Sequence, residues 1–249
     1  MKILGIIPSR YASTRFPGKP LIDIDGKTMI QRVYEQAKKA SSLTDVVVAT
    51  DDERIFAHIK SFNGNVVMTS SSHESGTDRC AEVLEKYAVR QVQDNSFDVV
   101  LNIQGDEPFI NPEQINQLSA CFSDDKTDIA TLIKEIKTEE ELFNPNRPKV
   151  DFDKDNFAKM FSRNVIPKLP HIKKEDWFKE HTFYKHIGIY GYRSDVLAKI
   201  SKLPQSPLEV KERLEQLRWL ENNYAIKIAT TDYEAVAIDT PEDLEKITF

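Results

Sequence analysis

The sequence of 249 residues contains little cysteine and no long apolar run. Its two cysteines, Cys80 and Cys121, are isolated, so they fit neither a disulfide framework nor the ligand spacing of a structural zinc site. No apolar run approaches the roughly 20 residues that span a bilayer. The apolar stretch before Arg10 is too short for a signal peptide. We therefore expect a cytoplasmic protein without stable membrane association.

Positive charge is in deficit, with 34 Lys and Arg against 40 Asp and Glu and a formal net charge of -6. Because nucleic-acid grooves usually need a net basic face, this balance argues against a nucleic-acid partner and favours small anionic ligands. The first 22 residues are the exception, since they lack Asp and Glu but carry Lys2, Arg10, Arg15 and Lys19. A local anion-binding site would explain this cationic segment, and so would a loop that merely aids solubility.

Strand-like and helix-like segments alternate through the first half of the chain. This alternation predicts an α/β fold with a mainly parallel, doubly wound (Rossmann-like) sheet and helices on both faces. Apolar runs predict strands at 2–8, 44–52, 65–70 and 97–108. Helical periodicity predicts helices at 28–40, 53–62 and 77–89, the first of them capped by Thr28.

The second half is less regular. Residues from about 128 to 193 are rich in β-branched and aromatic side chains with prolines between them, which predicts antiparallel strands added to the main sheet. We expect one catalytic domain over 1–249 with an embedded β-rich subdomain at about 139–193. A single amphipathic helix is expected at 208–223, and a short last helix is expected to be capped by Thr240 with Pro241 at its first position.

The opening loop has the chemistry of a phosphate site. Arginine presents a planar fork that suits phosphate oxygens, lysine adds a mobile charge, and Ser13 and the backbone near Gly18 can donate further hydrogen bonds. A nucleoside triphosphate is the partner that this chemistry favours. Neither the glycine-rich dinucleotide fingerprint nor the G-x-x-x-x-G-K-[ST] pattern occurs here, so another nucleotide-binding fold is required.

The stretch "PSRYASTRFPGKPL" at 8–21 resembles the amino-terminal signature of the 3-deoxy-manno-octulosonate cytidylyltransferase family, with Ser9 and Phe16 replacing the usual Ala and Leu. Further motifs that are similar to those of the family follow in order over nearly the whole chain: "HESGTDR", "NIQGDEPFI", "FNPNRPKV", "HIGIYGYR", "SPLEVKERLEQLR" and "AIDTPEDLE". The resemblance implies a nucleotidyltransferase fold. It also implies a homodimer in which the insertion at 139–193 covers the partner subunit and helps to form the sugar site.

The implied reaction transfers CMP from CTP to 3-deoxy-manno-octulosonate (Kdo), releasing pyrophosphate for lipopolysaccharide assembly, with Mg²⁺ as cofactor. The implied catalytic residues are Arg10, Arg15, Lys19, Asp106 and Asp239, and the last two would bind Mg²⁺. The implied nucleotide contacts are Arg10, Ser13, Lys19, Thr50, Asp51, Ser75, Gly76, Thr77 and Gln104. The implied sugar contacts are Arg79, Gln104, His186, Tyr190, Glu215 and Gln216.

Without the resemblance, many of these residues have plainer explanations as structural or solvated groups. Those explanations are a helix cap for Thr77 or Asp239, a turn for Asp106, a structural donor for His186 and the solvated side of a helix for Glu215 and Gln216.

Each alternative function is disfavoured by a particular motif or residue of the sequence. Sugar-1-phosphate nucleotidyltransferases typically open with a Gly-Gly-x-Gly-Thr-Arg-like loop, which this chain lacks, and the loop of CMP-sialate synthetases is richer in glycine and lysine. A noncatalytic nucleotide-binding regulator could dispense with Asp106 or Asp239, yet both are present. A glycosyltransferase could share a metal-binding acid at a strand end but would not need three cations in the opening loop.

Overall fold

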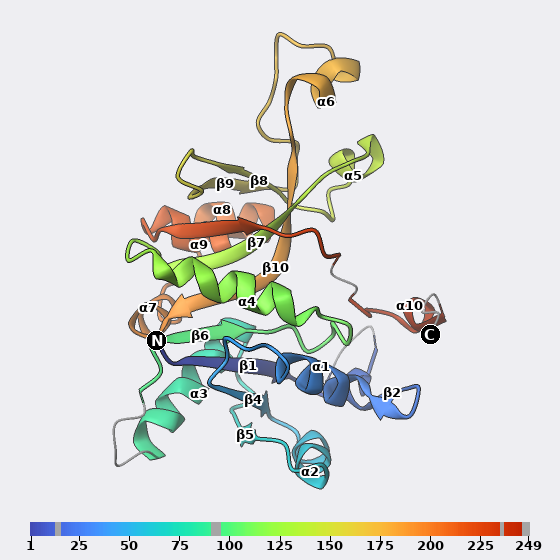
Figure 1. Ribbon diagram of the computed structural model, residues 1–249, viewed down its shortest axis with the longest axis vertical. Coiled ribbons are helices and arrows are strands. Elements are labelled where there is room, and N and C mark those ends of the chain that lie inside the picture. Colours follow the sequence, from blue (N-terminus) through green and yellow to red (C-terminus); the bar gives the residue numbers. More distant parts are fainter. Residues whose placement is uncertain (13–15, 91–95, 235–236, 246–249) are drawn as a thin grey trace.

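A nine-stranded mixed sheet forms the centre of the computed structural model, which describes residues 1–12, 16–90, 96–234 and 237–245 (Figure 1). Seven strands follow one another in the order β11-β7-β10-β6-β1-β4-β5, and β8 and β9 branch from β10. Their bounds are β1 (Ile3–Ser9), β4 (Asp45–Thr50), β5 (Val66–Met68), β6 (Val99–Asn102), β7 (Ile129–Glu135), β8 (Lys149–Phe152), β9 (Ala158–Ser162), β10 (Tyr184–Arg193) and β11 (Ile226–Thr230). A separate hairpin joins β2 (Asp23–Ile24) and β3 (Lys27–Thr28).

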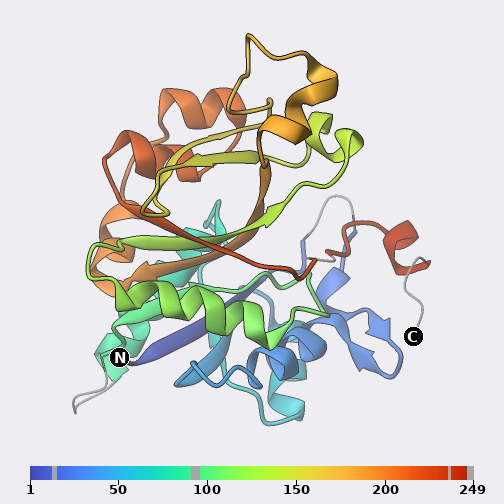
Figure 2. The same ribbon diagram turned by 45° about the horizontal axis from the view of Figure 1, so that its top comes forward.

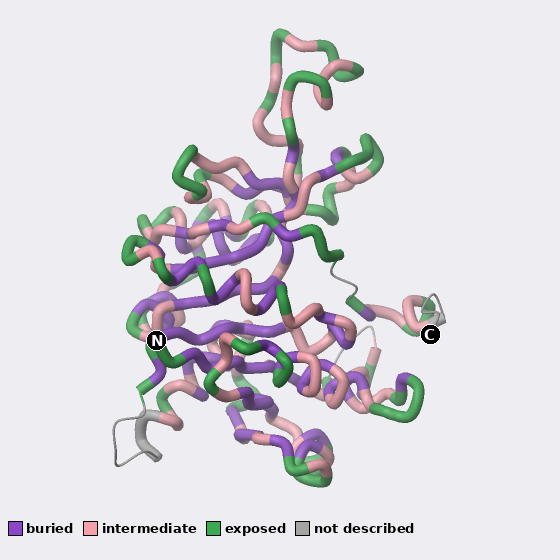
Figure 3. Tube along the Cα trace, in the orientation of Figure 1, coloured by how far each residue is buried: buried purple, intermediate pink, exposed green. Residues whose placement is uncertain are grey.

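Helices cover both faces of this sheet (Figure 2). The α-helices are α1 (Met29–Ala37), α2 (Glu53–Ser61), α3 (Gly76–Arg90), α4 (Pro112–Ala120), α5 (Glu139–Phe143), α6 (Trp177–Glu180), α7 (Ser194–Ile200), α8 (Pro207–Glu212), α9 (Gln216–Glu221) and α10 (Pro241–Glu245). Short 3₁₀ helices are η1 (Lys19–Leu21), η2 (Cys121–Ser123) and η3 (Lys174–Asp176). One apolar cluster packs α1, α2 and α4 against the sheet, and a second packs α3, α7 and α9 on the other face. Figure 3 shows that buried residues follow the central strands.

The strand directions confirm the α/β prediction. β1 runs parallel to both β4 and β6, β4 runs parallel to β5, and β7 runs parallel to β11. β10 is antiparallel to β6, β7 and β8. The parallel strands are largely apolar because helices cover them on both faces, and all of β6 is buried. Their carboxyl ends therefore meet at one edge, where ligands bind in doubly wound sheets.

Local caps start the helices that follow these strands. The Thr28 hydroxyl accepts a hydrogen bond from the Gln31 N–H at the start of α1, as predicted. Asp52 accepts from the Arg54 N–H at the start of α2, directly after β4. Such caps satisfy backbone donors that the first helical turn leaves unpaired.

The prediction of one helix over 208–223 is wrong, because the segment forms the two short helices α8 and α9. The break lies at Arg213, whose backbone is left-handed with φ 55°. A distant side chain stabilises this break, since Arg163 Nε donates to the Glu212 carbonyl at 2.7 Å and its Nη2 donates to the Arg213 carbonyl at 3.3 Å. Arg163 follows β9, so local helical periodicity could not reveal the break.

The insertion predicted at 139–193 contains α5, β8, β9, η3, α6 and β10. Its last strand, β10, lies between β6 and β7 inside the main sheet, whereas α5 and α6 project beyond the sheet at the top of Figure 1. The division of the chain into a catalytic domain and an insertion stays a prediction. Within the described ranges, every helix is too short or too polar to cross a membrane.

Two glycines of β10 provide a matched test of the core. A Cβ at Gly191 would lie 2.7 Å from both Leu101 Cδ2 and Phe122 Cε2, whereas a Cβ at Gly188 would meet nothing within 4 Å. We expect Gly191→Ala to lower the free energy of unfolding by about 1–3 kcal/mol through overpacking. Gly188→Ala should change it by less than about 0.5 kcal/mol. Urea denaturation measures both values, and equal losses would contradict this packing.

Candidate active site

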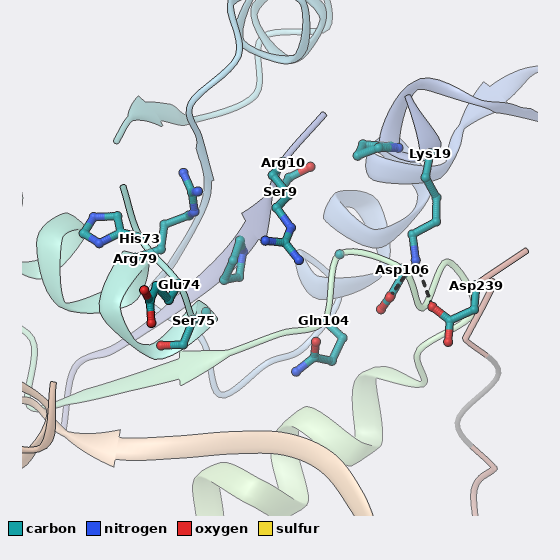
Figure 4. A pocket seen from close by; sticks show the side chains of 14 residues that line it. Ser9, Arg10, Lys19, His73, Glu74, Ser75, Arg79, Gln104, Asp106 and Asp239 are labelled. Carbon is teal, nitrogen blue, oxygen red and sulfur yellow. Dashed lines mark hydrogen bonds and ion pairs between the residues drawn. The ribbon is translucent and has the colours of Figure 1, made fainter. Parts of the chain in front are cut away.

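A cavity of about 260 Å³ opens at the carboxyl ends of β1 and β6 (Figure 4). It is lined by Pro8, Ser9, Arg10, Lys19, Pro20, His73, Glu74, Ser75, Gly76, Arg79, Gln104, Gly105, Asp106 and Asp239. Eight predicted site residues are therefore brought together, namely Arg10, Lys19, Ser75, Gly76, Arg79, Gln104, Asp106 and Asp239. The position of the cavity follows from the topology, because parallel strands end together at this edge.

Lys19 joins the two aspartates at one end of the cavity. Its Nζ lies 2.8 Å from Asp106 Oδ2 and 3.3 Å from Asp239 Oδ1 (Figure 4). Lys19 is 87 residues from Asp106 and 220 residues from Asp239 in the sequence. Without a cation between them, the two carboxylates would repel each other. The lysine ammonium therefore stabilises their approach.

Backbone contacts position both aspartates. The Ile238 N–H donates to the Asp106 carbonyl at 3.0 Å, which fixes the two segments side by side. The Asp243 carboxylate accepts from the Asp239 N–H, also at 3.0 Å. Before Asp106, a Cβ at Gly105 would lie only 2.7 Å from the Pro8 carbonyl oxygen, so this close approach to β1 requires glycine.

The opening loop is anchored where it enters and leaves the site. The Gly18 N–H donates to the Tyr11 carbonyl at 3.1 Å, and the Arg54 guanidinium lies 3.3 Å from the centroid of the Tyr11 ring. Arg10 and Lys19 both line the cavity. Of the predicted loop residues, Ser13 and Arg15 lie outside the described residues.

The paired carboxylates have the chemistry that a magnesium ion prefers. Among residues 1–12, 16–90, 96–234 and 237–245, no group of three or more His, Cys, Asp or Glu side chains could hold a metal ion. Mg²⁺ commonly takes only one or two carboxylates and completes its shell with water and substrate phosphates. Asp106 and Asp239, which converge on the same lysine ammonium, therefore fit such an ion.

The opposite wall comes from the start of α3. The Ser75 hydroxyl accepts from the Asp78 N–H at 3.1 Å and the Asp78 carboxylate accepts from the Ser75 N–H at 3.2 Å, so these two residues cap the helix. The alternative explanation of Thr77 as the cap is wrong, because Thr77 is inside α3 and its hydroxyl donates to Glu215 at 3.0 Å. A short polar side chain can bond either to its own turn or to a distant partner, and sequence does not distinguish these outcomes.

Arg79 lies on this wall and is 4% exposed. Its Nη1 donates to Thr69 at 2.5 Å, and its Nη2 lies 3.2 Å from the Asp51 carboxylate. Asp51 is outside the lining of the cavity and pairs with Arg79 behind this wall. The Thr50 side chain is fully buried and accepts from the Asp52 N–H at 3.2 Å, so it supports the turn after β4.

The other predicted sugar contacts, namely His186, Tyr190, Glu215 and Gln216, lie outside the lining of this cavity. The rings of His186 and Tyr190 lie 5.2 Å apart, and Tyr190 packs edge-on against Trp219 at 5.1 Å. Gln216 begins α9 and is 2% exposed, so the explanation that it lies on the solvated side of a helix is wrong. In the described structure its Nε2 is buried and has no hydrogen-bond partner.

Glu215 also differs from a solvated helix residue. It accepts from Thr77, and burial raises the pKa of its carboxyl group. It lines a second cavity of about 450 Å³, which shares His73, Glu74 and Ser75 with the first. Thr77 also lies 3.3 Å from the Tyr192 hydroxyl, so Glu215 is connected to the face of β10 that carries the aromatic side chains.

Gln104 connects the cavity with β10. It lines the first cavity, and its Nε2 donates to the Gly188 carbonyl at 2.7 Å. The register of β10 against β7 shifts between Ile187 and Tyr190, which marks a β-bulge at this point. Thr131 of β7 donates to the Ile189 carbonyl at 2.8 Å and so stabilises the bulge.

Some cavity residues were missed in the sequence. His73 and Glu74 precede the predicted Ser75, and only their place in the "HESGTDR" motif could have indicated them. Ser9 lines the cavity at the end of β1, and its hydroxyl is buried without a hydrogen-bond partner in the described part of the chain. Glu107 follows Asp106, and burial together with the Asp106 charge raises its pKa to about 7.

His186 is a neutral side chain in this setting. Its Nε2 lies 2.9 Å from the Thr131 hydroxyl, and removal from water lowers the pKa of the imidazole to about 3. The imidazole can therefore orient a ligand by hydrogen bonding but carries no charge at neutral pH.

This lowered pKa predicts a pH-dependent stability. The unfolded chain binds a proton at His186 below about pH 6.5 and the folded chain does not, so acidification favours unfolding. Between pH 6.5 and 4, His186 should contribute a loss of up to about 1.4 kcal/mol per pH unit. Replacing it in His186→Gln should remove that part of the slope in urea denaturation. An unchanged slope would show that His186 titrates normally in the folded protein.

Comparison with known proteins defines the class to which this site belongs. The family model described as "Cytidylyltransferase" matches residues 4–229, and the chain belongs to that family.

Similar proteins within this class carry the name of one enzyme. Two relatives named 3-deoxy-manno-octulosonate cytidylyltransferase come from Parabacteroides distasonis and Bacteroides thetaiotaomicron. The first is 56% identical, with 99% of this chain and 96% of the relative covered. The second is 57% identical, with 98% of this chain and 96% of the relative covered. The family resemblance noted in the sequence is thereby confirmed.

A solved structure agrees over the same length. It is described as CMP:2-keto-3-deoxy-manno-octonic acid synthetase complexed with CTP. It superposes with a TM-score of 0.89 at 39% identity and covers 99% of this chain and 96% of its own. A cytidylyltransferase from Leptospira borgpetersenii has a TM-score of 0.62 at 16% identity, covers 98% of this chain and 84% of its own, and supports the fold alone.

Proposed function

We propose that this cytidylyltransferase transfers CMP from CTP to the anomeric hydroxyl of Kdo, forming CMP-Kdo and pyrophosphate. The proposal rests on one observation. Lys19, Asp106 and Asp239 come together at one end of a cavity that Arg10 also lines. The names of the relatives supply the substrates, since they are Kdo cytidylyltransferases and the similar solved structure contains CTP. The product would serve lipopolysaccharide assembly, and the proposed location is the cytoplasm.

Charge is the main obstacle to this reaction. The sugar hydroxyl must approach the α-phosphate of an anionic triphosphate while carrying its own carboxylate nearby. Positioned cations stabilise the charge on the transferring group and on the departing pyrophosphate. Arg10 and Lys19 would supply that stabilisation, and Arg15 and Ser13 would extend it along the opening loop.

Asp106 and Asp239 would hold Mg²⁺, which when bound neutralises phosphate charge and polarises the α-phosphate. Lys19 keeps the two carboxylates together against their repulsion. On the opposite wall, Ser75 and Gly76 would contact the nucleoside, and Arg79 would contact the sugar.

Gln104 would contact both substrates, because it lines the cavity and bonds to the β10 bulge. Beyond it, Tyr190 and Gln216 would bind the sugar, and the Gln216 Nε2, which has no partner among the described residues, offers two donors to sugar oxygens. Neutral His186 would orient a hydroxyl through hydrogen bonding.

Pyrophosphate release tests this assignment directly. We expect release only with CTP plus Kdo and added Mg²⁺, and not with other nucleotides or with sialate or glucose-1-phosphate as acceptor. Asp106→Asn should lower kcat by about 100-fold or more because a positioned charge is lost. The matched control is Asp195→Asn on α7, where the aspartate pairs with the exposed Lys199 and should leave activity unchanged. Release with a sugar phosphate but not with Kdo would refute the assignment.

We further propose that the protein is a homodimer formed through the insertion. Phe143 is 45% exposed and borders an apolar cavity of about 570 Å³ together with Val165, Leu169 and Trp177. An exposed apolar surface of this kind commonly marks a protein interface. The second copy is the proposed occupant because cyclic pairs are the commonest assemblies of soluble enzymes.

Sedimentation at several protein concentrations tests the dimer. Phe143→Ser should weaken self-association by about tenfold or more if its ring is a central contact. Val210→Ser is the matched control, since Val210 is 60% exposed on α8 and lies outside the apolar cavity. A wild-type protein that sediments as a monomer at every concentration would exclude the proposal.

A further inference from the structure

Two lysines on neighbouring strands hold Glu234 after the end of β11. Glu234 Oε1 lies 2.7 Å from Lys185 Nζ on β10, and Oε2 lies 2.9 Å from Lys134 Nζ on β7. Lys185 and Lys134 are paired in the strand register, so their side chains meet the carboxylate from adjacent positions. Lys185 also contacts Glu141 of α5, which completes a group of two positive and two negative side chains.

Lys185 is the buried member of this group, whereas the Glu234 side chain is 41% exposed. The Lys185 side chain is 2% exposed, and the side chains of Lys134 and Glu141 are 23% and 24% exposed. Burial alone would raise the pKa of Glu234, but the hydrogen bonds from the two lysines outweigh it and lower the pKa. Glu234 is therefore ionised at neutral pH. Loss of its charge would leave the buried Lys185 with Glu141 as its remaining carboxylate partner in the described structure.

Glu234 precedes the segment that carries Asp239. The chain is attached to the sheet by the Thr231 N–H, which donates to the Ile133 carbonyl at 2.9 Å, and by Lys134 Nζ, which donates to the Asp232 carbonyl at 2.9 Å. It is attached again at the fully buried Ile238, beside Asp106. In Figure 1, α10, which follows Asp239, lies to the right of the sheet.

We propose that Glu234 is a positioning residue: held by Lys134 and Lys185, it anchors the segment after β11 so that Asp239 stays beside Asp106 and Lys19. Because the same Lys185 contacts Glu141 of α5, the anchor also connects the insertion with the aspartate pair. The consequence for nucleotide binding rests on the proposed function, whereas the consequence for opening of the segment does not.

Hydrogen exchange tests the anchor without relying on activity. In Glu234→Gln, backbone amides within 237–245 should exchange about tenfold faster than in wild type, because the segment opens locally more often. Amides of β1 and β4 should be unchanged. Calorimetry should show CTP binding in the presence of Mg²⁺ weakened by about tenfold. The matched control is Glu135→Gln, which removes a carboxylate of β7 that pairs with the exposed Lys137 and should leave both measurements within about twofold of wild type.

Unchanged exchange within 237–245 in a folded Glu234→Gln protein would overturn the proposal. If that variant does not fold, Glu234→Asp replaces it, since the shorter side chain keeps the charge but cannot reach both lysines. The same increase in exchange is expected for Glu234→Asp, and its absence is equally decisive. Failure of the proposed function would instead appear as a wild-type protein that does not bind CTP, and it would leave the exchange result intact.

Discussion

The site depends on the approach of two like charges from distant parts of the chain. Asp106 and Asp239 both lie within hydrogen-bonding distance of one lysine ammonium, and Coulomb repulsion would separate them without it. Neighbouring contacts restrict the freedom of these carboxylates. The Ile238 N–H binds the Asp106 carbonyl, and the Asp243 carboxylate binds the Asp239 N–H. The sheet supplies the setting by ending β1 and β6 at the same edge.

Pairing of a cation with carboxylates also positions residues elsewhere in the molecule. An acidic protein places its cations where anions converge: Lys19 at the aspartate pair, Arg79 against Asp51, and Lys185 between Glu141 and Glu234. Each of these cations is largely buried, and each has at least one carboxylate partner. Removing one partner from such a group leaves a desolvated charge, which is why these pairs fix positions more firmly than exposed pairs do.

Much of the fold could be predicted from the sequence because apolar periodicity is a local property. The strands around Ile3–Ser9 and Val99–Asn102 and the Thr28 cap follow from residues close to them. The break at Arg213 could not, because it depends on the guanidinium of Arg163.

The same distinction applies to the site. The resemblance identified Asp106 and Asp239, but their shared contact with Lys19 depends on long-range topology. The alternative bonding of Thr77 and the place of Asp51 behind Arg79 are likewise tertiary features.

Because of the bulge in β10, the number of residues in this strand is itself constrained. Side chains alternate between the faces of a strand, so His186 and Tyr190 lie on one face, and the Gly188 carbonyl accepts from Gln104 within the stretch where the register shifts. Deleting one residue here would turn every following side chain to the opposite face. Among relatives, this stretch should therefore tolerate exchanges of side chain more readily than any gain or loss of a residue.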